Sequence, residues 1–163
     1  METNTKNLFI VDASVITANN LKNYLQNRFG TSFYITAFND GETCLKEINS
    51  STDFVIMDYA LKGKNGLQIL KEIKAINPKT EVIMLSANKD IAVAIESFRN
   101  GATDYVVKGK GSAKRIKDKI YHLLTAPIRI LVKEFGVSKF MAAFLTTFVS
   151  MGIIVFVVMK AMY

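Results

Sequence analysis

Four polar side chains each end a short apolar run: Asp12 in NLFIVD, Asp58 in DFVIMD, Ser86 in EVIMLS and Lys108 in DYVVK. Carboxylates suit Mg²⁺, which takes oxygen ligands and uses one or two carboxylates together with phosphate and water. An ammonium group can neutralise a phosphoryl oxygen, and a hydroxyl can donate a hydrogen bond to another. Because an aspartate can carry an acyl phosphate, these residue types predict a site for a divalent cation and a phosphoryl group. Asp58 would be the attacking carboxylate.

Such a site needs elements that bring the four side chains together, and residues 7–126 alternate two sequence patterns. Apolar runs rich in β-branched and aromatic residues predict five strands, which are NLFIVD, SFYITAF, DFVIMD, EVIMLS and DYVVK. Amphipathic segments between them predict helices. Five β–α units in succession predict an α/β fold, a five-stranded doubly wound parallel sheet of flavodoxin type with helices on both faces. In such sheets ligands bind at the carboxyl ends of the strands, where the four polar side chains stand.

The spacing of apolar residues predicts the helices. Three segments put them on one face: Val15, Leu21, Tyr24, Leu25 and Phe29; Leu67, Leu70, Ile73 and Ile76; and Ile91, Ala94, Ile95 and Phe98. A fifth helix is expected from near Ser112.

The single cysteine, Cys44, lies in a further helical segment and is expected to be a buried thiol rather than a reactive one. The N-terminal METNTKN lacks the basic start and apolar core of a secretory signal, so a reducing, cytoplasmic location is expected.

Four stretches in order, FIVDAS, FVIMDYALKGKNG, VIMLSA and GATDYVVKG, resemble the response-regulator receiver domain. Among its members the chain is similar to the single-domain chemotaxis regulator. The resemblance covers residues up to 126 and leaves 127–163 outside it. It implies a phospho-acceptor signalling domain rather than an enzyme, with at most Mg²⁺-dependent self-phosphorylation and dephosphorylation. It also implies that a histidine kinase or a phosphotransfer protein is the partner.

The resemblance assigns a role to each matching position in this sequence. It makes Asp58 the phosphoryl acceptor and Asp12 the first member of an acidic pair that holds Mg²⁺, while the backbone carbonyl of Ala60 completes the metal shell. Lys108 matches the lysine that contacts the phosphoryl group.

Two further positions match the switch of the family. Ser86 corresponds to the hydroxyl that moves toward the phosphoryl group, and Tyr105 to the aromatic side chain that then swings inward. Each residue taken alone has a simpler explanation. Asp12 could cap the first helix, Ser86 could accept from a nearby backbone amide, and Tyr105 could be an aromatic at the sheet edge.

The sequence departs from the family pattern at three positions. Ala13 stands where the second acid of the pair is usual, and Gly109 and Lys62 each replace a frequent proline. A missing carboxylate near a protein surface can weaken cation binding by up to about 4 kcal/mol. We therefore expect Mg²⁺ binding and phosphorylation to be weakened but retained. The alternative is a pseudo-receiver, an adaptor that binds its partner without phosphorylation.

Residues 140–159 carry no charge, and Lys139 and Lys160 flank them. Twenty residues in a helix span about 30 Å, the thickness of the hydrocarbon core of a bilayer. This predicts a transmembrane helix that anchors the chain, followed by a short tail, 160–163. Residues 127–139 form a basic amphipathic stretch that is expected to lie on the membrane surface.

Charge predicts the orientation of this anchor. Residues 108–139 hold nine of the 21 Lys and Arg residues against two acids, and the rest of the chain is balanced. The positive-inside rule then places the receiver in the cytoplasm, on a single-pass protein of the bacterial inner (cytoplasmic) membrane.

Three further hypotheses concern the C-terminal part. Nucleic-acid binding through the basic residues is disfavoured, because they lead directly into the apolar segment. Small residues at every fourth position, Ala142, Thr146 and Ser150, are compatible with a homodimer through the transmembrane helix. A soluble oligomer held by the C-terminal helix is the third hypothesis.

Overall fold

The computed structural model describes residues 5–135, 147–148, 150–151 and 158–160. For residues 127–135 it describes the backbone alone. The strands are β1 (Lys6–Val11), β2 (Phe33–Phe38), β3 (Thr52–Asp58), β4 (Glu81–Ser86) and β5 (Asp104–Val107). The helices are α1 (Val15–Phe29), α2 (Gly41–Glu47), α3 (Gly66–Ile76), α4 (Ile91–Arg99) and α5 (Ser112–Phe135), with a 3₁₀ turn at Gly30–Ser32. The chain divides into two compact units, Met1–Lys119 and Ile120–Tyr163, and the sheet belongs to the first.

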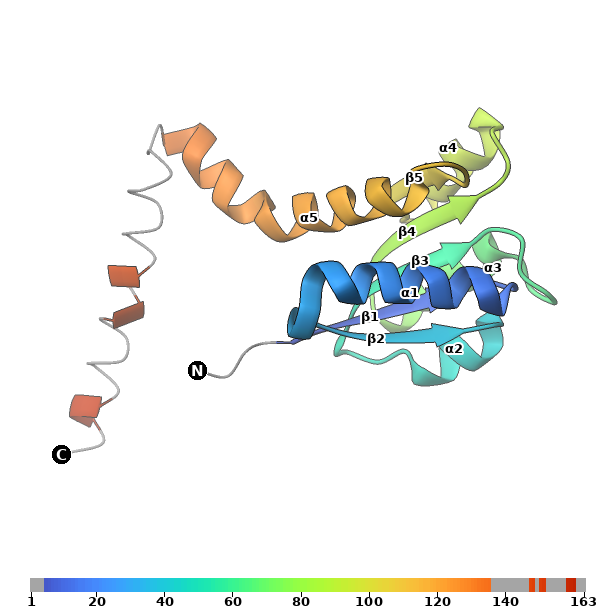
Figure 1. Ribbon diagram of the computed structural model, residues 1–163. Helices are drawn as coiled ribbons and strands as arrows, with labels where there is room; N and C mark the ends of the chain where they lie inside the picture. Colours follow the sequence, from blue (N-terminus) through green and yellow to red (C-terminus); the bar gives the residue numbers. More distant parts are fainter. Residues whose placement is uncertain (1–4, 136–146, 149, 152–157, 161–163) are drawn as a thin grey trace. The chain divides into compact units, whose positions relative to one another are not determined.

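All five strands are parallel and lie in the order β2-β1-β3-β4-β5 (Figure 1). The predicted five-stranded parallel sheet of flavodoxin type is therefore confirmed. This order reverses the direction of winding next to β1, between β1 and β3, and such a switch point opens a crevice at the carboxyl ends of the strands.

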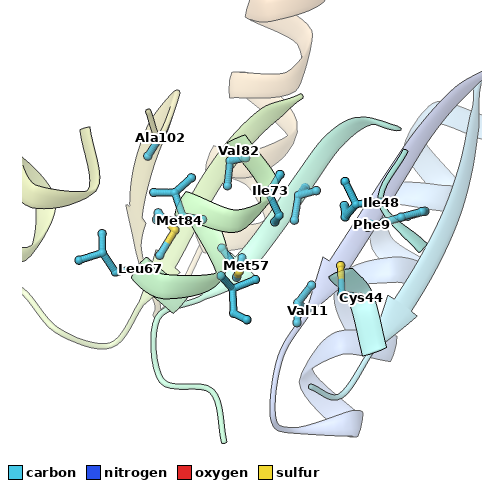
Figure 2. Close-up of a cluster of buried hydrophobic side chains, with 13 residues drawn as sticks. Phe9, Val11, Cys44, Ile48, Met57, Leu67, Ile73, Val82, Met84 and Ala102 are labelled. Atoms are coloured by element: carbon cyan, nitrogen blue, oxygen red, sulfur yellow. The ribbon is translucent and has the colours of Figure 1, made fainter. Parts of the chain in front are cut away.

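The strands are apolar on both faces because each face is covered. One face packs against α2 and α3 in a cluster that includes Phe9, Met57 and Met84 from the strands and Leu67 and Ile73 from α3 (Figure 2). The alternate strand residues, such as Ile10, Ile56 and Ile83, point to the other face and are also buried. Each such side chain contributes about 1.5–3 kcal/mol when buried. Cys44 lies in the cluster of Figure 2, fully buried as predicted.

Side-chain caps start the helices close to the ends of the strands. Ser14 caps α1, Asp40 caps α2 and Asp90 caps α4, while Asn65 and Gln68 form a capping box at α3. These caps hold the loops at the carboxyl edge of the sheet in defined positions.

The apolar face of α4 lies on the surface. Ile91 is 74% exposed, Ile95 46% and Phe98 49%, whereas the fully buried residue of this helix is Ser97. The helical spacing was correct, but Ser97 is the position of α4 that is buried, and this helix packs against the edge strand β5. In the same way Val15, in the first turn of α1, is half exposed, and Ala18, Leu21 and Leu25 form the buried face.

The C-terminal predictions fall largely outside the described residues. Of the predicted span 140–159, the structure describes only 147, 148, 150, 151, 158 and 159, and within the parts of the chain it describes no helix is both long and apolar enough to cross a membrane. The backbone of 127–135 continues α5, and Ala142 and Thr146 are not described.

Candidate phospho-acceptor site

The four predicted residues lie at one edge of the sheet, at the ends of β1, β3, β4 and β5. Backbone hydrogen bonds run on past the strands to fix them there. The amide of Asp12 donates to the Phe38 carbonyl oxygen over 3.1 Å, and that of Lys108 donates to the Ser86 carbonyl oxygen over 2.7 Å. Asp58 is the last residue of β3, paired in register with Leu85.

Lys108 bridges the two acids. Its Nζ lies 2.7 Å from Oδ2 of Asp12 and 2.6 Å from Oδ2 of Asp58. The carboxylate side chains are only 3% and 7% exposed, and that of Lys108 is 26% exposed. Burial opposes the charge of Lys108, but the hydrogen bonds to Asp12 and Asp58 outweigh it, so the pKa of Lys108 is raised above its ordinary 10.5. The structure therefore brings the acids and the ammonium into direct contact.

The second oxygen of each acid accepts a backbone hydrogen bond. Oδ1 of Asp12 accepts from the amide of Ser14 over 2.9 Å, and Oδ1 of Asp58 accepts from the amide of Ala60 over 3.2 Å. All four carboxylate oxygens thus have a donor. Asp12 does not cap α1. The N-cap is Ser14, whose side chain accepts a hydrogen bond from the amide of Thr17.

Ser86 is buried beside this group, and a short chain of hydrogen bonds connects it to Tyr105. Its Oγ accepts from the amide of Asn88 over 3.0 Å, and the Tyr105 hydroxyl donates to the Asn88 carbonyl oxygen over 2.9 Å. The simpler explanation for Ser86, a partner for a local backbone amide, thus describes the geometry seen. The same geometry also makes Asn88 a physical link between the hydroxyl and the aromatic ring.

Gly66 lets α3 begin against the acceptor. A Cβ at this position would overlap the Asp58 carbonyl oxygen and lie 2.8 Å from the Cα of Tyr59, and both neighbours are backbone. Only glycine allows this approach, so Gly66 fixes the loop that follows Asp58.

The donor set can hold a hard cation. Asp12 and Asp58 offer only oxygen, which fits Mg²⁺, and the backbone carbonyl of Ala60 stays the further ligand that the resemblance predicts. Ala13 contributes no ligand, and among the described residues no group of three or more His, Cys, Asp or Glu side chains forms a candidate metal site. Mg²⁺ would therefore depend on two carboxylates that Lys108 already contacts.

Two lysines follow the acceptor in the loop before α3. Lys64 is paired with Glu72 at 2.8 Å, whereas Lys62 is exposed at the rim. Beyond β5, Gly109 and Gly111 have positive φ values of 150° and 81°, and Lys110 between them is exposed. Exposed lysines therefore lie in the loops that follow β3 and β5.

The structure thus defines a class of α/β domain, an open parallel sheet of this order with two acids, a hydroxyl and a lysine at its carboxyl edge. The response regulator receiver domain matches residues 8–121. The chain belongs to this family, whose members are signalling domains of two-component systems.

Relatives and solved structures agree with this assignment. The chain is 31% identical over 80 residues to the transcriptional regulatory protein ZraR of Escherichia coli K12, a match that covers 48% of this chain and 18% of ZraR. It is 34% identical over 80 residues, 48% of this chain, to the DNA-binding transcriptional regulator NtrC of the same organism, covering 17% of it. The chain thus spans under a quarter of the length of these curated relatives.

Among solved structures, the response regulator TrrA of Thermotoga maritima in complex with Mg(2+)-BeF is 28% identical. It has a TM-score of 0.64, and the match covers 73% of this chain and 99% of TrrA. A CheY-like receiver domain protein of Methanospirillum hungatei JF-1 shares the fold at 21% identity, with a TM-score of 0.67. That match covers 77% of this chain and 98% of the other.

Sequence reasoning missed two residues that shape the site, Ser14 and Asn88. Ser14 follows Asp12 closely and precedes a helix, so its preference for the N-cap position was a usable signal. Asn88 acts mainly through its backbone, which no side-chain pattern reveals.

Proposed function

We propose that this chain is a membrane-anchored response regulator that receives a phosphoryl group on Asp58 from a histidine kinase or a phosphotransfer protein and signals by protein interaction. The contact of one ammonium, that of Lys108, with both Asp58 and Asp12 carries the proposal. A buried carboxylate beside a fixed cation is placed to accept a phosphoryl group whose new negative charge that cation can neutralise.

The reaction follows from these positions. An oxygen of Asp58 attacks the phosphorus of the donor, the bond from phosphorus to the leaving group breaks, and an acyl phosphate forms on Asp58. Lys108 turns to a phosphoryl oxygen as a point charge, and Ser86 donates its hydroxyl to another. Mg²⁺, held by Asp12, Asp58 and the Ala60 carbonyl, would supply further charge neutralisation. No enzyme activity beyond self-phosphorylation and dephosphorylation is assigned.

The output is a changed surface around Tyr105. When Ser86 turns to the phosphoryl group, its Oγ no longer accepts from the amide of Asn88, whose carbonyl oxygen holds Tyr105. A groove of about 510 Å³ lies beside that ring, and Lys89, Arg115 and Lys119 contribute to its lining. The exposed apolar face of α4 adds the kind of surface that binds a protein partner.

We place the domain in the cytoplasm, anchored to the bacterial inner membrane by residues 140–159. The uncharged segment and the basic excess before it support this placement. The spacing of Ala142, Thr146 and Ser150 supports a homodimer through the anchor. The relatives ZraR and NtrC are named transcriptional regulators, but the aligned 80 residues are a small part of each, and we assign no nucleic-acid partner here.

A pseudo-receiver adaptor is the second candidate. Ala13 favours it, since the site lacks one carboxylate and the remaining acids are already neutralised in part by Lys108. Such an adaptor would bring a membrane partner to one place without phosphoryl transfer.

The deciding experiment incubates the full-length chain, kept in detergent, with acetyl phosphate and millimolar MgCl₂, and follows its intact mass. We expect the mass of one phosphoryl group to be gained by the wild type and by Asp53→Asn, which removes a half-buried acid on the same strand, β3. We expect no gain for Asp58→Asn. A wild type without any gain identifies the adaptor, and a gain that persists in Asp58→Asn excludes Asp58 as the acceptor.

A further inference from the structure

The resting site already holds a cation, and that cation belongs to the chain. The ammonium of Lys108 lies within 2.7 Å of one oxygen of Asp12 and within 2.6 Å of one oxygen of Asp58. The other oxygens accept from the amides of Ser14 and Ala60. A metal ion that enters this site must therefore take oxygens from Lys108 or share oxygens that already have a donor.

The net charge of the site also disfavours binding of Mg²⁺ alone. Two carboxylates and one ammonium leave a single negative charge, so Mg²⁺ alone would turn a mostly buried site positive. A third carboxylate at position 13 would prevent this, but Ala13 has none. On phosphorylation Asp58 exchanges its one charge for the roughly two of a phosphoryl group. Mg²⁺ then meets two net negative charges, which it neutralises.

We propose that Mg²⁺ binds this site appreciably only together with a phosphoryl-type anion, and that Lys108 takes the place of the metal between the two acids in the resting state. The anion draws Lys108 onto its own oxygens, which releases Oδ2 of Asp12 and Asp58 and adds oxygen ligands for the metal. The inference rests on the proposed function, since it concerns the same site. Linkage requires that the metal strengthen anion binding by the same factor.

The test is a calorimetric titration of the full-length chain in detergent with MgCl₂, with and without beryllofluoride as a stable analogue of the phosphoryl group. We expect beryllofluoride to raise the affinity for Mg²⁺ at least tenfold, and MgCl₂ to raise the affinity for beryllofluoride by the same factor. In the absence of the anion, Ala13→Asp should raise the affinity for Mg²⁺ by about tenfold or more. Ala13→Asn is the matched control, because asparagine has the shape of aspartate without its charge. The affinity of this variant for Mg²⁺ should stay at the wild-type value.

Lys108→Met tests the ammonium directly, since it frees both Oδ2 atoms. Its affinity for Mg²⁺ without anion should rise above that of the wild type, read as calorimetric binding or as a Mg²⁺-dependent rise in Tm. If Lys108→Met fails to fold, the Ala13→Asp and Ala13→Asn pair decides alone.

The outcomes separate this inference from the proposed function. A wild type that is phosphorylated on Asp58 but binds Mg²⁺ equally well with and without beryllofluoride overturns the coupling and leaves the function standing. A wild type that neither gains a phosphoryl group nor binds beryllofluoride at saturating MgCl₂ overturns both.

Discussion

Replacing Lys108 by Met should destabilise the chain strongly, because two buried carboxylates lose their shared partner. Removing one member of a buried ion pair costs about 3–5 kcal/mol. The side chain of Lys108 is 26% exposed, so we take the lower end, about 3 kcal/mol. For a unit the size of Met1–Lys119 this corresponds to a fall in Tm of about 10 °C.

The assay is thermal and urea unfolding of the full-length chain in detergent, followed by far-ultraviolet circular dichroism without Mg²⁺. Lys110→Met is the matched control, since Lys110 is exposed in the same loop and its loss should change the free energy of unfolding by no more than about 0.5 kcal/mol. If Lys108→Met loses no more stability than Lys110→Met, the ammonium does not neutralise the two acids and the reasoning about the site is refuted.

The same pair of proteins has a defined pH dependence. The pKa of Lys108 is raised in the folded state above its ordinary 10.5, so the folded chain holds this proton more tightly than the unfolded chain does. Its contribution is fully present below about pH 10 and is lost as the pH rises through the folded pKa. The stability gap between wild type and Lys108→Met should therefore narrow only in strong alkali, and a gap that closes between pH 7 and 9 would contradict the assignment.

Three further outcomes are expected. Gly66→Ala should cost about 2–3 kcal/mol in urea unfolding, because its Cβ would overlap the backbone after Asp58, which cannot yield as a side chain does; an unchanged midpoint would show that α3 can shift freely. Cys44 is buried and burial raises the pKa of its thiol from 9.0 to about 12, so a thiol reagent at pH 8 should label it only after denaturant is added. Rapid labelling of the native chain would disprove that burial. If residues 140–159 form the proposed anchor, Ile153→Lys should release part of the chain from carbonate-washed membranes, since a lysine in the middle of a membrane span costs about 2.5–3.5 kcal/mol. Ile153→Leu should not release it, and equal retention of both variants would argue against the anchor.

The sheet could be predicted from the sequence because its strands are short, apolar on both faces and separated by helical segments. The parallel arrangement then places Asp12, Asp58, Ser86 and Lys108 at one edge, whatever the details of packing. Periodicity also gave α4 its apolar face. It could not show that this face would stay exposed and that Ser97 would be buried instead, because that depends on which face of the helix packs against β5.

The double contact of Lys108 lay beyond any local pattern. Lys108 lies 96 positions from Asp12 and 50 positions from Asp58 in the sequence. The contact depends on how far a flexible side chain reaches across the strand ends. The N-cap of α1 also could not be assigned from the sequence alone. Asp12 and Ser14 are both favourable caps two residues apart, and only the backbone geometry at Ser14 and the use of Asp12 by Lys108 decide between them.

These contacts change how the two candidate functions can be told apart. Ala13 removes a carboxylate and Lys108 occupies the remaining two, so a titration with Mg²⁺ alone would show weak binding for an active receiver and for an adaptor alike. The two differ only when a phosphoryl-type anion is present, because only then does the active site release its acids to the metal. A weak response to Mg²⁺ is thus evidence about Ala13 and Lys108, and the response to metal and anion together is the evidence about function.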